Sequence, residues 1–203
     1  LDFGSSRIEF YGPITESESD RNNGSVVMKV IYGDTSFLFT GDAEREEEQE
    51  ILNAGYDLSA TVLKVGHHGS RNSTTYPFLR EIMPKYAVIS VGENSYGHPT
   101  EDVLSRLRDA DVKVYRTDMQ GDIIAVSDGK TVTITTKKNK DAQTNPTENE
   151  KLSSSKSSAN QEICQYIGNK NTKKFHYPEC AAVSQMKEKN KVFLNCTRDE
   201  ALH

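Results

Sequence analysis

The sequence predicts an α/β layered domain, followed by a polar linker and a small module at its C-terminal end. Apolar runs alternate with helical patterns between residues 35 and 116, hairpin patterns stand at both ends of the domain, and the composition turns polar at residue 137. Strands that alternate with helices are typical of a sheet covered by helices. We therefore expect a domain at 1–136, a flexible linker at 137–161 and a module at 162–203.

Strand patterns dominate the start of the chain. A short strand is expected at 7–10, and the strands at 25–32 and 35–40 form a predicted hairpin around Gly33-Asp34. Every second residue of the strand at 25–32 is apolar, which predicts that this set shares the covered face of the sheet: Val26, Met28, Val30 and Tyr32.

Helices and strands then alternate to the end of the domain. The first helix carries acidic residues in its opening turns, where the helix dipole favours them, and Gly55 is a suitable stop signal. The expected helices are 42–54, 75–83 and 101–109. The expected strands are 60–65, 86–91 and 112–116, with a last hairpin of 123–127 and 131–136.

Composition limits the function classes. The net charge of −5 argues against a protein that coats nucleic acid by bulk electrostatics, although a local basic groove remains compatible with it. Three cysteines cannot form a self-contained disulfide framework, and no apolar run reaches the roughly 20 residues of a membrane-spanning helix. The first residues show no signal-peptide pattern. Because the chain begins with Leu1 and not with Met, and reads as though already inside a domain, we expect a fragment of a longer protein.

Two predicted strands end in turns that carry potential metal ligands. Asp42 follows the strand at 35–40, where its hard oxygens could bind divalent cations or simply cap the next helix. His67 and His68 lie between glycines after the strand at 60–65, and imidazole suits zinc, iron or manganese. The alternative for the histidines is a structural turn. Strand ends are where α/β folds place their chemistry, which favours a metal site.

Other polar residues follow these turns. His98, in Gly97-His98-Pro99, is a candidate general acid, substrate contact or turn residue. Ser70, Asn72 and Ser73 precede a predicted helix, where they would contact a phosphate or cap the helix.

Four linked motifs resemble the metallo-β-lactamase-fold hydrolase domain of ComEC-type DNA-internalisation proteins. They are Asn22-Asn23-Gly24-Ser25-Val26-Val27, Phe37-Leu38-Phe39-Thr40-Gly41-Asp42-Ala43-Glu44, Leu63-Lys64-Val65-Gly66-His67-His68-Gly69-Ser70 and Tyr96-Gly97-His98-Pro99. The resemblance covers about residues 1–136 and implies the C-terminal half of an αββα sandwich.

The resemblance implies a metal-dependent phosphodiesterase or nuclease that acts on DNA. Asp42 would bridge two zinc or manganese ions, His67 would be a terminal ligand with His68 as the alternate, and His98 and Ser70 would contact substrate. The superfamily's His-x-His-x-Asp-His type motif is absent from this sequence. Its middle His ligand has no counterpart either, because Asn22 and Asn23 stand in that segment, as in the ComEC-type group. The fragment alone is therefore expected to be inactive.

The end of the chain resembles a truncated Ada-like zinc-binding module. His176 and Cys180 match the module's early ligand pair, and a structural zinc would need a later Cys-x-x-Cys after residue 203. The alternative is an unrelated His and Cys on a loop. Cys164 and Cys196 do not fit the pattern and are expected to be small apolar residues or free thiols.

The rival functional hypothesis is a non-catalytic module that binds nucleic acid or a surface partner on a degenerate hydrolase fold. The family picture favours an extracytoplasmic or secreted location, with the cytoplasm as the alternative. The sequence predicts no oligomeric state.

Overall fold

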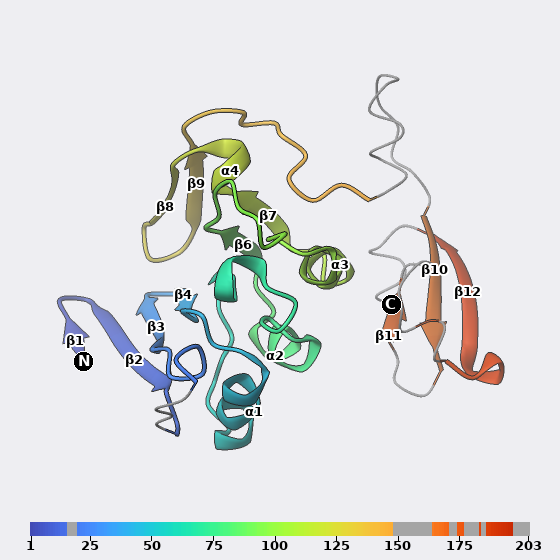
Figure 1. Cartoon of the computed structure of the whole chain (residues 1–203), viewed down its shortest axis with the longest axis horizontal. Coiled ribbons are helices and arrows are strands. Elements are labelled where there is room, and N and C mark those ends of the chain that lie inside the picture. Colours follow the sequence, from blue (N-terminus) through green and yellow to red (C-terminus); the bar gives the residue numbers. More distant parts are fainter. Residues whose placement is uncertain (16–19, 148–163, 171–173, 177–182, 184–185, 197–203) are drawn as a thin grey trace. The chain divides into compact units, whose positions relative to one another are not determined.

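The computed structural model of the chain describes residues 1–15, 20–147, 164–170, 174–176, 183 and 186–196. They belong to two compact units, one of residues 1–145 and one of residues 146–203. Figure 1 shows the helices and strands of each unit. Across the described ranges, no helix is long and apolar enough to cross a membrane.

The first unit is built on a seven-stranded sheet whose strands follow one another in chain order. Strands β1 to β4 are antiparallel and strands β4 to β7 are parallel. Their bounds are β1 (Asp2–Phe3), β2 (Ser6–Gly12), β3 (Val27–Tyr32), β4 (Thr35–Phe39), β5 (Val62–Lys64), β6 (Tyr86–Ile89) and β7 (Lys113–Arg116). The parallel half brings the carboxyl ends of β4, β5 and β6 to one edge of the sheet.

Three helices lie on one side of this sheet in Figure 1: α1 (Arg45–Ala54), α2 (Tyr76–Ile82) and α3 (Glu101–Asp109). Their buried residues Ile51, Phe78 and Leu107 join a single apolar core with residues of the strands. Leu38, Leu63, Ala87 and Val114 form one register row across the parallel strands, and all four are buried. The predicted α/β class is confirmed. The prediction of 101–109 matches α3, whereas α1 begins three residues after the predicted start at residue 42.

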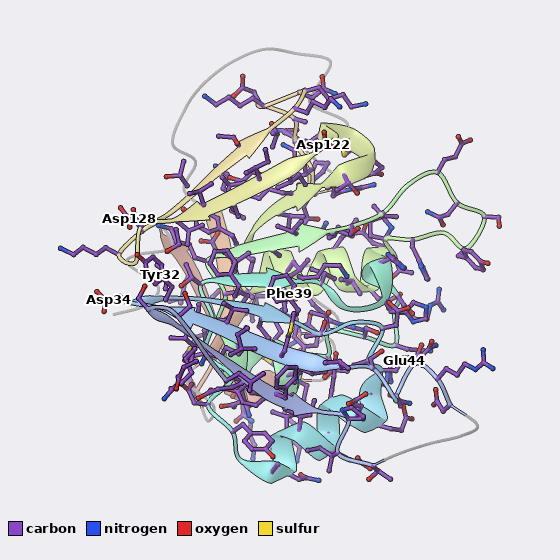
Figure 2. All side chains as sticks on the ribbon, turned by 90° about the vertical axis from the view of Figure 1, so that its left-hand side faces the viewer. Tyr32, Asp34, Phe39, Glu44, Asp122 and Asp128 are labelled. Atoms are coloured by element: carbon purple, nitrogen blue, oxygen red, sulfur yellow. The ribbon has the colours of Figure 1, made fainter. Side chains whose placement is uncertain are left out.

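The buried face of β3 is the opposite of the predicted one. Val27 and Lys29 are buried, while Val26 is 54% exposed and Met28 and Val30 are half-buried. A lysine fits under the helices because its Nζ donates to the main-chain oxygen of Asp57 at 2.9 Å and to its carboxylate at 3.1 Å. Figure 2 shows the uncovered strand face with Phe39 on it. The alternating apolar residues of β3 therefore lie on the uncovered face of the sheet, together with half-exposed Phe10.

A hairpin of β8 (Ile123–Ser127) and β9 (Val132–Thr136) follows α4 (Thr117–Gln120), a helical turn that the sequence did not predict. Its tip contacts the β3–β4 turn, as Figure 2 shows at Tyr32, Asp34 and Asp128. The Asp34 N–H donates to the Gly129 oxygen at 2.6 Å. Gly33 has φ +56°, and a Cβ there would lie 2.1 Å from that oxygen, so the contact requires glycine.

The first unit ends at Asn145, later than the expected boundary at residue 136. Thr144 donates to the Val114 oxygen at 2.5 Å, and Asn145 donates to the Leu104 oxygen at 2.9 Å while accepting from Arg108 at 2.6 Å. These polar side chains attach the start of the expected linker 137–161 to α3 and β7. Residues 148–161 lie outside the described residues.

The second unit contains a three-stranded antiparallel sheet in the order β11-β10-β12. Its described elements are β10 (Cys164–Asn169), β11 (Lys174–His176), the 3₁₀ turn η2 (Glu188–Asn190) and β12 (Lys191–Cys196). The register sets Cys164 opposite Cys196, and His176 opposite Ile167. Cys180 lies outside the described residues, so the zinc pair of His176 and Cys180 stays a prediction.

Candidate metal centre

The candidate site lies at the carboxyl ends of β4, β5 and β6. Asp42 follows β4, the 3₁₀ turn η1 (Gly66–Gly69) follows β5, and the loop with His98 follows β6. The Thr40 hydroxyl donates to the Lys64 oxygen at 3.1 Å, and the His67 N–H donates to the Gly41 oxygen at 3.1 Å. The two turns singled out in the sequence are therefore hydrogen-bonded to each other.

Both histidines of η1 have left-handed backbone conformations. His67 has φ +42° and His68 has φ +54°, a region that costs a non-glycine residue of order 1–3 kcal/mol. Such strain persists only where the surrounding structure enforces it, and it gathers at functional sites. The adjacent strained histidines favour a functional turn over a structural one.

His68 is the histidine that lies beside Asp42. Its Nδ1 is 2.6 Å from the Ser90 oxygen, and its Nε2 is 3.8 Å from Asp42 Oδ1. A carbonyl oxygen only accepts hydrogen bonds, so Nδ1 carries a proton and Nε2 is the ring nitrogen that faces Asp42. Two ligands of one tetrahedral zinc lie about 3.3 Å apart, so a modest approach lets Asp42 and His68 share one ion.

His67 is paired with a carboxylate that the sequence analysis did not select. Its Nδ1 lies 2.9 Å from Glu44 Oε1, and Glu44 also accepts from Asn22 and Asn72 at 3.4 Å each. A carboxylate on Nδ1 fixes the ring and leaves Nε2 as the lone-pair nitrogen, the usual arrangement behind a metal-bound histidine. Glu44 belongs to the motif Thr-Gly-Asp-Ala-Glu, but in the sequence it is one of several acidic residues at the start of a helix. The helix dipole alone accounts for acidic residues there, so nothing in the sequence marks Glu44 as a partner of His67.

His98 completes a cluster of three imidazoles. Its ring centroid is 5.5 Å from that of His67, and the ring stacks on Tyr96, which is 82% exposed. Asn94 shapes this loop by accepting from the N–H groups of Tyr96 and His98 at 3.1 and 3.0 Å. Burial first, and then the proximity of His67 and His68, lower the pKa of His98, so its ring is neutral at pH 7.

Ser73 is not placed to contact substrate, contrary to the prediction. It is fully buried, and its hydroxyl donates to the Ala43 oxygen at 2.7 Å. Ser70 is nearly buried, and its Oγ accepts from the Asn72 N–H at 3.4 Å. Neither Ser70, Asn72 nor Ser73 caps α2, because Thr75 is its N-cap residue and no side chain in the described part of the chain makes the capping hydrogen bond. The N–H groups of Thr74 and Thr75, just before the helix, bond to Glu48 of α1.

The donor set fits part of a divalent metal site. Asp42 offers carboxylate oxygens and His68 an imidazole nitrogen, a combination that both zinc and manganese accept. Within the described ranges, no three His, Cys, Asp or Glu side chains gather closely enough to hold a metal ion. The prediction favoured His67 as the ligand with His68 as alternate, and the structure brings His68 rather than His67 to Asp42.

Lys64 is a further charged group near Asp42. Its Nζ donates to the Val65 oxygen at 2.7 Å. Burial lowers the pKa of Lys64, and the charge of Asp42 opposes that shift. The acidic ligand therefore has a partly buried cation in its surroundings.

Comparisons with known proteins identify relatives of this region. Residues 4–93 match the family model described as Metallo-beta-lactamase superfamily. ComE operon protein 3 of Bacillus subtilis is 43% identical over 112 residues, which are 55% of this chain and 14% of the relative. Competence protein ComA of Neisseria gonorrhoeae is 40% identical over 116 residues, which are 56% of this chain and 17% of the relative.

A third relative is Recombination protein 2 of Haemophilus influenzae, 37% identical over 103 residues, which are 50% of this chain and 13% of the relative. The chain thus spans only a small part of the length of each of these proteins.

Proposed function

We propose that the first unit of this chain is a metallo-β-lactamase-fold domain of the ComEC-type competence group and that it contributes to a divalent-metal-dependent phosphodiesterase that acts on DNA. The observation that carries the proposal is the arrangement of His68 and Asp42. One imidazole nitrogen is anchored on a carbonyl, and the other faces a carboxylate 3.8 Å away at the carboxyl edge of the parallel strands.

The chemistry follows from the roles of the side chains. Asp42 and His68 would hold the cation, and Glu44 keeps the proton of His67 on Nδ1. A divalent cation supplies Lewis-acid stabilisation of the charge that develops on phosphate and activates a water nucleophile. The neutral ring of His98 lies next to His67, where it would contact the substrate or a departing oxygen.

DNA is the proposed substrate because of what the names of the similar proteins say. By name, one of the relatives is a competence protein, one is a ComE operon protein and one is a recombination protein. We extend a role in competence to this chain as part of the proposal. Location outside the cytoplasm, and a structural zinc in the second unit, remain predictions.

Cleavage of DNA by the protein at its full natural length tests the proposal. We expect manganese- or zinc-dependent cleavage of end-labelled DNA, lowered at least about 100-fold by Asp42→Asn or His68→Ala, since these remove proposed ligands. Asp34→Asn is the matched control, because Asp34 is an exposed carboxylate of the same hairpin at the opposite end of β4. Binding of DNA without any cleavage would instead support the non-catalytic module.

A further inference from the structure

Two buried charged residues lie behind the histidine turn and take no part in the chemistry described above. Glu48 of α1 is 1% exposed and Arg106 of α3 is 8% exposed. Buried charges are costly unless they are paired and hydrogen-bonded. Both side chains direct their hydrogen bonds to the main chain of residues 71–75, the segment that follows the turn.

Glu48 binds the N–H groups of this segment. Its two carboxylate oxygens accept from Thr74 at 2.5 Å and from Thr75 at 2.9 Å. Thr75 is the N-cap residue of α2, and no side chain of α2 caps that end. A neighbouring helix thus supplies the carboxylate that binds the N-cap N–H, a role that the Glu of a capping box ordinarily has, and it binds the preceding N–H as well.

Arg106 binds the carbonyl groups of the same segment. Its Nη1 donates to the Ser73 oxygen at 2.9 Å and to the Thr74 oxygen at 3.3 Å, and its Nη2 donates to the Arg71 oxygen at 3.0 Å. The planar guanidinium can reach three carbonyls in a fixed geometry, which a lysine ammonium cannot reproduce.

Thr74 is the residue whose main chain bonds to both Glu48 and Arg106. It has φ +53°, which is strained for a β-branched residue, and its N–H bonds to Glu48 while its C=O bonds to Arg106. Its hydroxyl accepts from the Gly66 N–H at 3.3 Å, at the first residue of the histidine turn. A fixed Thr74 therefore fixes the base of the turn.

A second connection runs through the main chain of the loop. The Ser73 N–H donates to the Ser70 oxygen at 3.1 Å, and the Ser70 N–H donates to the His67 oxygen at 2.9 Å. The strained conformations of His67 and His68 thus lie at one end of a hydrogen-bonded loop whose other end is held by two buried charges.

We propose that Glu48 and Arg106 are positioning residues that form a charge clamp on the loop 66–75 and thereby set the orientation of His67 and His68 for metal binding. The clamp consists of the Glu48 carboxylate on the N–H groups of Thr74 and Thr75 and the Arg106 guanidinium on the carbonyls of residues 71, 73 and 74. Its link to metal binding rests on the proposed function, whereas its effect on the loop does not.

Amide hydrogen exchange, followed by NMR on this chain at pH 8, where the Glu48 carboxylate is ionised, tests the clamp itself. In Glu48→Gln and, separately, Arg106→Lys, we expect the amides of Gly66, Ser73 and Thr74 to exchange at least about tenfold faster, because local opening no longer breaks charge-assisted bonds. Amides in the middle of β4, β5 and β6 are expected to keep their protection. Glu81→Gln and Arg80→Met are the controls, because Glu81 and Arg80 form an exposed ion pair on α2.

Metal affinity of the full-length protein separates positioning from simple stabilisation. For the folded clamp variants we expect manganese or zinc to bind about 10–100-fold more weakly, as for other groups that orient metal ligands. The clamp is refuted if amide exchange in the loop 66–75 is unchanged in the two clamp variants. It is also refuted if their amide protection falls equally throughout the first unit. A loosened loop with unchanged metal affinity would overturn the positioning role. Failure of the wild-type protein to bind metal would refute the proposed function, and the loop measurements would still decide the clamp.

Discussion

Replacing Glu47 by glutamine should stabilise the first unit at neutral and alkaline pH. Glu47 is 2% exposed, and neither of its carboxylate oxygens has a hydrogen-bond partner within the part of the chain that the structure describes. Its Oε1 lies against Gly12, where an added Cβ would be 2.3 Å away. A buried carboxylate without a partner is unfavourable in its charged form, and glutamine keeps its shape without the charge.

The magnitude follows from the pKa of Glu47. Burial raises this pKa from 4.5 to about 7, with smaller contributions from Glu50 and Asp20. The nearby Ser25 N–H opposes the shift, but its hydrogen bond goes to the Asn22 oxygen at 3.1 Å, so the Glu47 carboxylate has no partner of its own among the residues described. Because the folded pKa lies above the unfolded one, the contribution of Glu47 to stability is most favourable below pH 4.5 and is lost as the pH rises through 7. At about 1.4 kcal/mol per pKa unit, the full loss is of order 3 kcal/mol. Burial of the amide reduces the expected gain to about 1–2 kcal/mol at pH 8.

Urea unfolding at pH 5, 6, 7 and 8 measures this effect for the wild type and Glu47→Gln. The difference in unfolding free energy should grow with pH and level off above about pH 8. Glu48, whose pKa is also raised to about 7 by burial, is present in both proteins and cancels from the difference. Exposed Glu81 supplies the control variant Glu81→Gln, which should show no such trend. A pH-independent difference, or a less stable Glu47→Gln at pH 8, would refute the reasoning.

Three further substitutions test other parts of the structure. Glu44→Ala removes the partner of His67 Nδ1, so the full-length protein should bind metal about 10–100-fold more weakly with little change in Tm; an unchanged affinity would show that Glu44 does not orient a ligand. Gly33→Ala places a Cβ 2.1 Å from the Gly129 oxygen at a backbone φ of +56°, so it should lower the unfolding free energy by about 1–3 kcal/mol or more. Gly92→Ala is the control and should be near neutral, because no atom lies within 4 Å of a Cβ at Gly92. Lys29→Met removes two hydrogen bonds to Asp57 but keeps the buried stem, so the loss should be only about 0.5–1.5 kcal/mol; a loss above about 3 kcal/mol would contradict this account of the lysine.

Much of the fold could be predicted from local patterns. The helix at 101–109 was placed at its observed bounds because Val103, Leu104 and Leu107 repeat at helical spacing and all three are buried. The face of β3 was predicted wrongly because alternation of apolar residues shows that two faces differ and not which one is covered. Lys29 lies on the covered face only because Asp57, far away in sequence, accepts its ammonium.

The candidate site could be located from the sequence but not fully resolved. Glycine-flanked ligands after strands indicated Asp42, His67 and His68, which the structure brings to one edge. Which histidine lies beside Asp42 depends on the strained backbone of η1 and on the Ser90 carbonyl, and neither leaves a local signal. Glu44, Glu48 and Arg106 act through contacts between distant elements. Their sequence neighbourhoods look like ordinary charged helix surfaces.

The most direct test of the central claim is whether Asp42 and His68 hold the same metal ion. Titration of the full-length protein with manganese should broaden the imidazole resonances of His68 first, and Asp42→Asn should weaken this effect at least about tenfold, because manganese accepts carboxylate and imidazole ligands together. Asp34→Asn should leave the titration unchanged. Equal broadening of His68 in the wild type and Asp42→Asn, or none in either, would contradict the assignment of this edge as a metal site.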